Sequence, residues 1–440
     1  MVNLFPMQFD EAVNYLLSLG HETLAMKLGL ANVTRLLAAL DNPQQAYPAV
    51  QIAGTNGKGS TAVLLAAICR AAGICTGLYT SPHLVSLTER INIDGAQIAP
   101  AEFAHHATQV RAAAEQLHNE TGARPTFFEQ VTAIALLAFR AAGVRLAILE
   151  TGLGGRLDAT TAAHAATVAI TPIALDHQAY LGDTLAEIAA EKAAIIRPDT
   201  SVVVAPQPAE ARARVLARCR ACGVTPAWAT EHITVINATT DGRLRATFET
   251  PQDVYADVAL ALRGRHQLTN AAIAIALAEL LRASGFSISH AAIIEGLQTA
   301  AHPGRLELWP GPPPVLFDGA HNPAGAAALR AYLDEFVRAP VTLVFGAMSD
   351  KELDPIAAAL FPGAQRLVLT RPTNIRAATL DVLTGLAHQH ASAGAFALVE
   401  SPAAALKRAC EITPPDGLIC VTGSLYLVGE VQGLVRASVN

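Results

Sequence analysis

The chain has 440 residues, of which 52% are hydrophobic and only 15% are charged, and its formal net charge is −6. Ordinary soluble domains carry about 25% charged residues, so the composition alone could indicate a membrane protein. A membrane-spanning helix needs roughly 20 consecutive apolar residues, and the strongest apolar runs here end earlier, at Arg140 and Glu279. Because Met1–Asp10 lacks a basic segment followed by an apolar core, we expect no secretory signal and a soluble cytoplasmic protein.

The composition also excludes other classes of protein. Abundant aliphatic residues and few charges exclude disorder, and the negative net charge argues against non-specific nucleic-acid binding. We therefore expect neither a nucleic acid nor a membrane as partner. Six cysteines are too few for a disulfide scaffold, and Cys219 and Cys222 form a lone CxxC within the predicted helix Ala209–Cys222. A zinc site would need a second pair, so we interpret both as ordinary helix residues.

Short apolar segments alternate with alanine-rich helical segments, which predicts an α/β architecture with a mostly parallel sheet. The strands expected in the first part of the chain are Ala49–Ala53, Gly77–Tyr79, Val144–Leu149, Thr167–Thr171 and Ser201–Ala205. Residues 231–262 alternate between apolar and polar side chains, which favours a β-rich insertion. The length allows two or three domains.

A domain boundary is expected at Ala300–Gly304, because Pro303 and Gly304 cannot continue the predicted helix Ala291–Thr299. A new α/β series follows, with expected elements at Val315–Phe317, Ala324–Phe336, Val341–Phe345, Leu353–Leu360, Arg366–Leu369 and Gly417–Val421. We thus divide the chain into residues 1–300, a nucleotide-loop domain, and residues 301–440, a smaller Rossmann-like domain. Substrates often bind in the cleft between two such domains.

The sharpest feature is a glycine-rich turn between the strand Ala49–Ala53 and a predicted helix Ser60–Ala72. Its residues are Gly54, Thr55, Asn56, Gly57, Lys58, Gly59 and Ser60. Such a turn lets backbone N–H groups and a helix N-terminus approach phosphate oxygens. The strict Walker pattern fails, because Ile52 holds the first glycine position and Gly59 the hydroxyl position. A tight turn without phosphate is the alternative, but the three glycines, the lysine and the strand–turn–helix context favour phosphate binding.

Polar residues follow three further predicted strands. Ser81, Glu150 and His177 each come at or shortly after a strand end, and in a parallel sheet these ends share one edge. Each could instead be a helix cap, a surface acid or a loop histidine. Because magnesium prefers oxygen ligands, their shared edge favours a metal–nucleotide site.

The residues alone leave the roles of two other segments undecided. Lys192 lies in the predicted helix Thr184–Ile196 beside apolar residues, the usual setting of a helix-face lysine. Asp318–Pro323 combines a strand end, a tight turn and a helix start. Asp318 could contact ribose or phosphate and His321 an anion, while capping of the helix by Asn322 explains the segment equally well.

Several segments, in this order, resemble the folylpolyglutamate synthases, and most closely the bacterial bifunctional dihydrofolate synthase/folylpolyglutamate synthase family of the Mur ligase superfamily. The similar segments are Gly54–Ser60, Thr80–Leu84, Glu150–Thr160, Glu191–Ile196, Asp318–Pro323, Phe345–Met348 with Asp350 and Lys351, and Val421–Tyr426. They extend over nearly the whole chain, from about residue 28 to residue 431.

The resemblance implies an ATP-dependent amide ligase that acts through an acyl phosphate. ATP phosphorylates a carboxylate of the pterin substrate, and the amino group of L-glutamate then displaces phosphate. The first activity joins glutamate to dihydropteroate, and the second lengthens the γ-glutamyl tail of reduced folates. Phosphoryl transfer depends mainly on positioning and charge neutralisation, which a lysine, loop N–H groups and magnesium would supply. The family is usually monomeric.

The resemblance also assigns site residues. It implies catalytic roles for Lys58, Lys192 and His321, and it places Asn270, Arg305 and Asp318 on ATP together with the loop Gly54–Ser60. It implies two magnesium ions, one held by Ser81 and Glu150 and one by Glu150, His177 and a carbamylated Lys192. It places the pterin on Arg90, Phe128, Arg156, Asp158 and Ala159.

Two positions depart from the family pattern near the expected pterin contacts, with Thr161 where many relatives carry Asn and Gln130 where an aromatic or small residue is common. Three alternatives remain in view. A Mur ligase acting on a UDP-muramoyl peptide would share the ATP chemistry. A nucleotide-hydrolysing switch protein would need no glutamate. A non-catalytic interaction module would leave Ser81, Glu150 and His177 unexplained.

Overall fold

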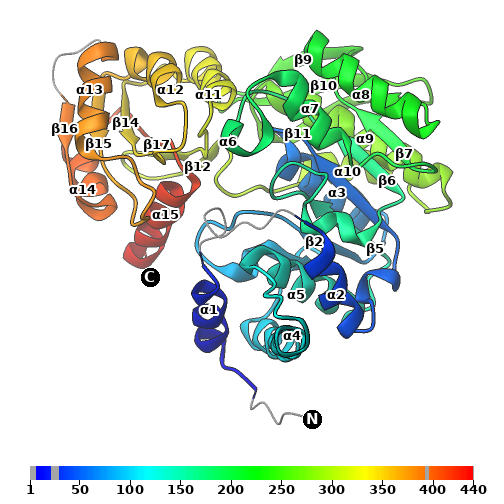
Figure 1. Cartoon of the computed structure of the whole chain (residues 1–440). Coiled ribbons are helices and arrows are strands. Elements are labelled where there is room, and N and C mark those ends of the chain that lie inside the picture. Colours follow the sequence, from blue (N-terminus) through cyan, green and yellow to red (C-terminus); the bar gives the residue numbers. More distant parts are fainter. Residues whose placement is uncertain (1–5, 21–28, 392–395, 440) are drawn as a thin grey trace.

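The computed structural model of the protein describes residues 6–20, 29–391 and 396–439. Its strands form sheets of eight, three and six strands, and the six-stranded sheet lies to one side of the other two (Figure 1). Met1–Phe5, part of the segment in which we expect no secretory signal, lies outside the described residues. Among the residues described, no helix combines the length and apolar character that a membrane crossing requires.

The eight-stranded sheet has the order β4-β3-β2-β5-β1-β6-β7-β8. Its strands are β1 (Ala49–Ala53), β2 (Thr76–Tyr79), β3 (Ile91–Ile93), β4 (Ala96–Gln97), β5 (Leu146–Glu150), β6 (Thr167–Ile170), β7 (Ser201–Val204) and β8 (Ala227–Trp228). The six strands from β2 to β8 pair in parallel, and β3 and β4 extend one edge in antiparallel fashion. Strand Ala49–Ala53 was predicted with its observed limits, and the other predicted strands of this sheet differ by one or two residues at one or both ends.

Both faces of this sheet are buried. In β5, Ala147 and Leu149 belong to one hydrophobic core, whereas Leu146 and Ile148 belong to the core on the other face. The first core contains residues of α1, α2, α4, α5, α7 and α8, and the second contains residues of α3, α9 and α10. Strands covered on both faces read as continuous apolar runs, which explains the high apolar fraction without a membrane.

The helices of this part are α1 (Phe9–Ser18), α2 (Ala31–Ala39), α3 (Lys58–Ala71), α4 (Pro100–Thr121), α5 (Phe127–Ala141), α6 (Gln178–Leu181), α7 (Leu185–Ala193), α8 (Ala209–Cys222), α9 (His266–Ala283) and α10 (His290–Thr299), with 3₁₀ turns η1 (Pro43–Gln45), η2 (Leu87–Arg90) and η3 (Ala159–Ala163). The predicted helix Thr184–Ile196 was wrong at its C-terminal end, because the backbone tightens after Ala193, where the N–H of Ile196 bonds to the carbonyl of Ala193. Cys219 and Cys222 lie in α8 as free thiols, as predicted.

Residues 231–262 form the predicted β-rich insertion. Strands β9 (Ile233–Ala238), β10 (Arg243–Glu249) and β11 (Val254–Arg263) make a three-stranded antiparallel sheet. One side of this sheet contributes Ala246, Phe248 and Val258 to the core that contains α3 and α9.

The six-stranded sheet begins after α10 and has the order β12-β13-β17-β14-β15-β16. Its strands are β12 (Glu307–Trp309), β13 (Val315–Phe317), β14 (Val341–Phe345), β15 (Arg366–Leu369), β16 (Phe396–Leu398) and β17 (Leu418–Thr422). Its helices are α11 (Pro323–Phe336), α12 (Leu353–Leu360), α13 (Leu380–His390), α14 (Pro402–Ile412) and α15 (Leu425–Val439), with η4 (Phe361–Gly363). Helices cover both faces (Figure 1), and all pairings are parallel except that of β12 with β13. This arrangement agrees with the expected Rossmann-like sheet.

Candidate active site

The glycine-rich turn joins β1 to α3, and its glycines are required by contacts with other segments. Gly57 caps α3 with φ +86°, and a Cβ atom there would lie 2.2 Å from Oδ1 of Asn270. Gly54 has φ +150°, and a Cβ atom there would lie 1.9 Å from Oγ1 of Thr171. Values below about 3 Å leave no room for a side chain, so neither position tolerates another residue without rearrangement.

The backbone donors of the turn divide into two groups. The N–H groups of Thr55 and Asn56 both bond to the carbonyl of Pro172, at 3.0 and 3.2 Å. Residues 58–60 form the first turn of α3, where backbone N–H groups have no partner within the helix. The anion-binding part of the turn is therefore the N-terminus of α3, where free N–H groups and the helix dipole both favour negative charge.

A cavity of about 370 Å³ lies over this helix N-terminus, and segments from both large sheets line it. All but one of the candidate nucleotide and metal residues reach its wall. They are Thr55, Asn56, Gly57, Lys58, Gly59, Ser60, Ser81, Glu150, His177, Lys192, Asn270, Arg305, Asp318 and His321, with only Gly54 of the turn outside the lining. The structure thus brings together residues from eight separate segments that were selected from the sequence alone. We refer to this space as the nucleotide cavity.

Two lysines enter the nucleotide cavity beside the turn. Nζ of Lys58 donates to the carbonyl of Thr55 at 3.1 Å, and Nζ of Lys192 donates to the carbonyl of Gly54 at 2.8 Å. Lys192 is only 5% exposed, so the interpretation as a helix-face surface lysine is wrong. Burial, followed by the positive charge of Lys58, lowers the pKa of Lys192 to about 7. A lysine with such a pKa is often the neutral, reactive amine at physiological pH.

The four candidate metal ligands contribute different chemistry. The carboxylate of Glu150 is 6% exposed and accepts the backbone N–H of Ser81 at 3.2 Å. Burial raises the pKa of Glu150, and the nearby Lys58 opposes this shift. Burial lowers the pKa of His177 to about 3, so its imidazole is neutral and can donate a lone pair to a cation. No three His, Cys, Asp or Glu side chains of the described chain gather into a metal cluster.

The remaining nucleotide candidates lie around the linker to the six-stranded sheet. Asp318 accepts the backbone N–H groups of Leu306 and Ala320, both at 2.9 Å, and therefore also fixes the end of the linker. Burial raises the pKa of Asp318, while Arg305 opposes the shift. Arg305 has no hydrogen bond or ion pair in the described part of the chain and lines the cavity. An unpaired guanidinium at this position suits an anionic ligand.

His321 is held in one orientation. Its Nδ1 lies 2.7 Å from the carbonyl oxygen of Gly319 and must carry the hydrogen, because a carbonyl can only accept. Burial lowers the pKa of His321 to about 4, which leaves Nε2 as the unprotonated nitrogen. Nε2 faces the nucleotide cavity 3.7 Å from the carboxylate of Asp176.

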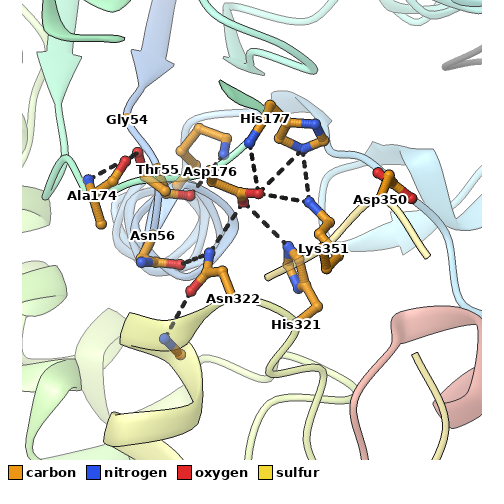
Figure 2. A network of polar contacts seen from close by, with 12 residues as sticks. Gly54, Thr55, Asn56, Ala174, Asp176, His177, His321, Asn322, Asp350 and Lys351 are labelled. Atoms are coloured by element: carbon orange, nitrogen blue, oxygen red, sulfur yellow. Dashed lines mark hydrogen bonds and ion pairs between the residues drawn. The ribbon is translucent and has the colours of Figure 1, made fainter. Parts of the chain in front are cut away.

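Asp176 lies at the centre of a polar network between the two large sheets (Figure 2). Nζ of Lys351, from the loop after β14, lies 2.6 Å from Oδ1 of Asp176, and both side chains are only 8% exposed. Nδ2 of Asn322 donates to Asp176 at 3.1 Å and to Asn56 of the glycine-rich turn at 3.0 Å. Burial would raise the pKa of Asp176, but the positive charge and the hydrogen bond of Lys351 oppose this shift, and the pKa lies well below its usual range.

The sequence analysis missed this network, although each member was close to a feature it used. Asp176 precedes His177, and Lys351 belongs to a segment quoted for the family resemblance. The expected cap by Asn322 is present, because its Oδ1 accepts the N–H of Gly325 at 2.8 Å, but its amide nitrogen also bridges the two sheets. Proximity across 175 residues of sequence carries no local signal.

A second cavity, of about 180 Å³, adjoins the first and shares Ser81, Gly152, His177 and His321 with it. We refer to it as the acceptor cavity. Of the candidate pterin residues, Phe128, Asp158 and Ala159 line it. The carboxylate of Asp158 accepts the N–H groups of Gly152 and Leu153 at 2.8 and 2.9 Å, so it also shapes the glycine-rich loop after β5.

The other two pterin candidates do not reach this wall. Arg90 is 1% exposed, and its Nε donates to Nδ1 of His83 at 2.9 Å. Arg156 is exposed and pairs with Glu191 at 3.0 Å. Neither side chain lines the acceptor cavity.

The two departures from the family pattern also lie away from the acceptor cavity. Gln130 is 1% exposed and accepts the hydroxyl of Tyr15 at 2.9 Å. The hydroxyl of Thr161 donates to the carbonyl of Gly155 at 2.7 Å and accepts from Gln51 at 2.7 Å. Both side chains satisfy buried polar groups of the scaffold, and neither lines the acceptor cavity.

The six-stranded sheet contributes side chains to the acceptor cavity that the sequence analysis did not select. They are Met348, Lys351, Arg376, Ser424, Leu425 and Tyr426. The guanidinium of Arg376 pairs with Asp350 at 3.2 Å and lies 5.9 Å from the ring centre of Tyr426. The wall of the acceptor cavity therefore contains two cationic side chains, Lys351 and Arg376, as well as aromatic ones.

Two protein-family models match the chain. Residues 52–278 match the Mur ligase middle domain, and residues 304–425 match the glutamate ligase domain of Mur ligases.

Individual relatives agree with these matches. The chain is 36% identical over 441 residues to a probable bifunctional folylpolyglutamate synthase/dihydropteroate synthase of Haloferax volcanii, covering 97% of the chain but only about half (50%) of that relative. It is 36% identical to the dihydrofolate synthase/folylpolyglutamate synthase of Mycobacterium tuberculosis, covering 80% of the chain and 76% of the relative. The solved structure of Mycobacterium tuberculosis folylpolyglutamate synthase complexed with ADP is similar, with a TM-score of 0.90 and 32% identity over 97% of this chain and 98% of that one.

The ion pair of Asp176 and Lys351 yields a stability prediction. Asp176→Asn leaves a buried ammonium group without its counter-charge, so we expect a loss on the order of 3 kcal/mol in the free energy of unfolding, measured in urea. Lys351→Met should cost a similar amount, and the double variant should cost less than the sum of the two. Glu411→Gln, which breaks a half-exposed pair with Arg408, should change little. Strictly additive losses from Asp176→Asn and Lys351→Met would contradict a direct interaction.

Proposed function

The chain belongs to the Mur ligase family, with folylpolyglutamate and dihydrofolate synthases as its relatives, and on this premise we propose that it is an ATP-dependent ligase. It joins L-glutamate to dihydropteroate and to the γ-carboxyl group of reduced folates. One observation carries the proposal: the nucleotide and acceptor cavities adjoin, with Ser81, His177 and His321 in their common wall. A γ-phosphate and an acceptor carboxylate can meet there.

The proposed reaction activates a poor electrophile. A carboxylate oxygen of the acceptor attacks the γ-phosphorus of ATP, the bond from that phosphorus to the bridging oxygen breaks, and ADP leaves. The glutamate nitrogen then attacks the acyl carbon, the carbon–oxygen bond to phosphate breaks, and the amine loses a proton. The N–H groups of residues 58–60, Lys58 and Arg305 neutralise the charge that develops on the phosphate oxygens.

The two cationic side chains in the wall of the acceptor cavity support glutamate as the second substrate. Glutamate carries two carboxylates, and Lys351 and Arg376 are the cations in this wall. His321 lies between the two cavities with Nε2 unprotonated, so we assign it the acceptance of the amine proton. Phe128, Asp158 and Ala159 line the same cavity, and a flat pterin ring can pack on the aromatic ring of Phe128. Arg90 and Arg156 would act on the pterin only through a rearrangement, because both lie outside this lining.

The donor set supports a role for magnesium. Glu150 is a buried carboxylate whose hydrogen-bond donor in the described chain is one backbone N–H, and Ser81 and His177 line the same cavity. Oxygen-rich sites of this kind suit Mg²⁺. A bound ion would neutralise phosphate charge and polarise the γ-phosphoryl group. We propose two ions, with Ser81 and Glu150 holding one and Glu150, His177 and Lys192 the other.

Carbamylation of Lys192 would complete the second ligand set. Carbon dioxide reacts with neutral amines, and the burial and lowered pKa of Lys192 favour the neutral form. The product carries a carboxylate in place of the amine, in the cavity that Glu150 also lines. Asn270 and Asp318 line the nucleotide cavity, and we assign them to the nucleoside part of ATP.

The wider organisation follows from the same premise. We propose a nucleotide-binding domain at residues 1–300 and a C-terminal domain at residues 301–440. The family matches end at 278 and begin again at 304, and α10 ends at Thr299, which supports this division. We further propose that the protein acts as a monomer in the cytoplasm. The alternative substrate, a UDP-muramoyl peptide, has no support among the relatives above.

An omission assay tests the proposed function. The protein is mixed with ATP, magnesium, dihydropteroate and L-glutamate, and ADP release is followed while each component is left out in turn. We expect ADP release to depend on all four, because the acyl phosphate is consumed only by glutamate. Replacing dihydropteroate with tetrahydrofolate tests the second activity. Equal ADP release without glutamate and without any pterin would contradict the ligase and favour a nucleotide-hydrolysing switch.

A second prediction concerns Lys192. Incubation with ¹³C-labelled bicarbonate should give a carbamate carbon signal in the wild-type protein that is absent from Lys192→Ala. The variant should lose ligase activity, and added bicarbonate should not restore it. Lys407 on α14 is an ordinary lysine, so Lys407→Ala should keep both the signal and the activity. Full activity in Lys192→Ala would remove this residue from the site.

A further inference from the structure

His302, in the linker between α10 and β12, contacts the glycine-rich turn. Nδ1 of His302 lies 3.1 Å from Oγ of Ser60, in the first turn of α3. Ser60 is 5% exposed and 242 residues away in sequence. This contact joins the segment that connects the two large sheets to the helix N-terminus proposed to bind phosphate.

The contact belongs to a longer chain of buried hydrogen bonds. Nδ2 of Asn270 donates to Oε1 of Gln267 at 2.8 Å, and Nε2 of Gln267 donates to Oγ of Ser60 at 3.4 Å. Gln267 is 1% exposed and Asn270 is 3% exposed. The hydroxyl hydrogen of Ser60 is then available for Nδ1 of His302. This series of hydrogen bonds runs from Asn270, which lines the nucleotide cavity, to His302 in the linker.

His302 also explains the departure of the turn from the Walker pattern. A Cβ atom at Gly59 would lie 3.0 Å from Cε1 of His302 and 3.2 Å from Oε2 of Glu150. These distances are tighter than most real Cβ contacts, so the imidazole and the carboxylate leave little room for the usual hydroxyl residue. The imidazole therefore packs directly on the turn that nucleotide is proposed to occupy.

Cavities beside the linker leave space around it on the side of the eight-stranded sheet. Residues 299–303 line two cavities, of about 340 and 760 Å³, which lie along the same segment. Beyond them the linker is fixed to the six-stranded sheet, because the N–H of Gly319 bonds to the carbonyl of Gly304 at 2.9 Å and Asp318 holds Leu306. A shift of His302 would thus be transmitted to the C-terminal domain.

We propose that His302 is a positioning residue that couples nucleotide binding at the glycine-rich turn to the orientation of the C-terminal domain. The proposal rests on the proposed function for its ligand, ATP, but not on the ligase chemistry. Phosphate bound at residues 58–60 fixes the first turn of α3, and Ser60 in that turn fixes His302. His302 in turn fixes the linker, which leads into the domain that carries Asp318, His321 and the loop of Lys351. His302 itself lines neither the nucleotide cavity nor the acceptor cavity.

Amide hydrogen exchange with the non-hydrolysable analogue AMPPCP tests the coupling. In the wild-type protein we expect AMPPCP to slow exchange both at residues 54–60 and in the linker, residues 300–306. His302→Leu should keep the slowing at residues 54–60 and lose it in the linker. His302→Asn, which retains a hydrogen-bonding group near Ser60, should restore it, and Ser60→Ala should reproduce the loss without changing the linker sequence. Thermal melting of each variant checks that it folds.

Steady-state kinetics give a second readout. His302→Leu should lower kcat for ligation roughly tenfold and change the KM for ATP less than about threefold, because nucleotide still binds but the domains are less often aligned. Linker exchange that responds to AMPPCP in His302→Leu as in the wild type would overturn the proposal, as would a wild-type linker that does not respond. A wild-type protein that shows both protected segments but no glutamate-dependent turnover would refute the proposed function and leave the coupling intact.

Discussion

The site depends on one buried carboxylate that its own domain does not neutralise. Asp176 follows a strand of the eight-stranded sheet, yet the ammonium group paired with it belongs to Lys351 on the six-stranded sheet. Burying a charge is costly unless it is paired and hydrogen-bonded, so the arrangement is favourable only when the two domains face each other as they do here. Asn322 then links the same carboxylate to the glycine-rich turn. The same carboxylate therefore helps to fix both the orientation of the two domains and the shape of the nucleotide site.

The sparse charge of the chain has a corresponding explanation. The central strands are buried on both faces, and their helices are rich in alanine, so most of the molecule needs no ionic groups. Four of the charged residues, Lys58, Glu150, Asp176 and Lys192, line the nucleotide cavity. Low charge in the scaffold and concentrated charge in the cavity suit chemistry in which anionic groups must approach one another. Backbone N–H groups and cationic side chains neutralise the negative charge of those groups within the cavity.

Much of the fold and part of the site could be predicted from the sequence, because some elements have local signatures and others do not. Strands such as Ala49–Ala53 and the glycine-rich turn have local signatures, and residues at strand ends share an edge in any parallel sheet. Lys192 could be recognised only through the family resemblance, because the same helical pattern describes a surface lysine. The pairing of Asp176 with Lys351 and the contact of His302 with Ser60 bring together residues far apart in sequence, so only the fold reveals them.

Isotope transfer distinguishes activation of the acceptor as an acyl phosphate from any route that leaves its carboxylate oxygens in place. Dihydropteroate labelled with ¹⁸O in its carboxylate is converted with ATP and L-glutamate, and the inorganic phosphate is examined by ³¹P NMR. Because the carboxylate oxygen that attacks phosphorus leaves with the phosphate, we predict one ¹⁸O atom per phosphate released during ligation. Phosphate without ¹⁸O, formed while the amide product accumulates, would contradict the acyl phosphate and the arrangement of the two adjoining cavities proposed to form it.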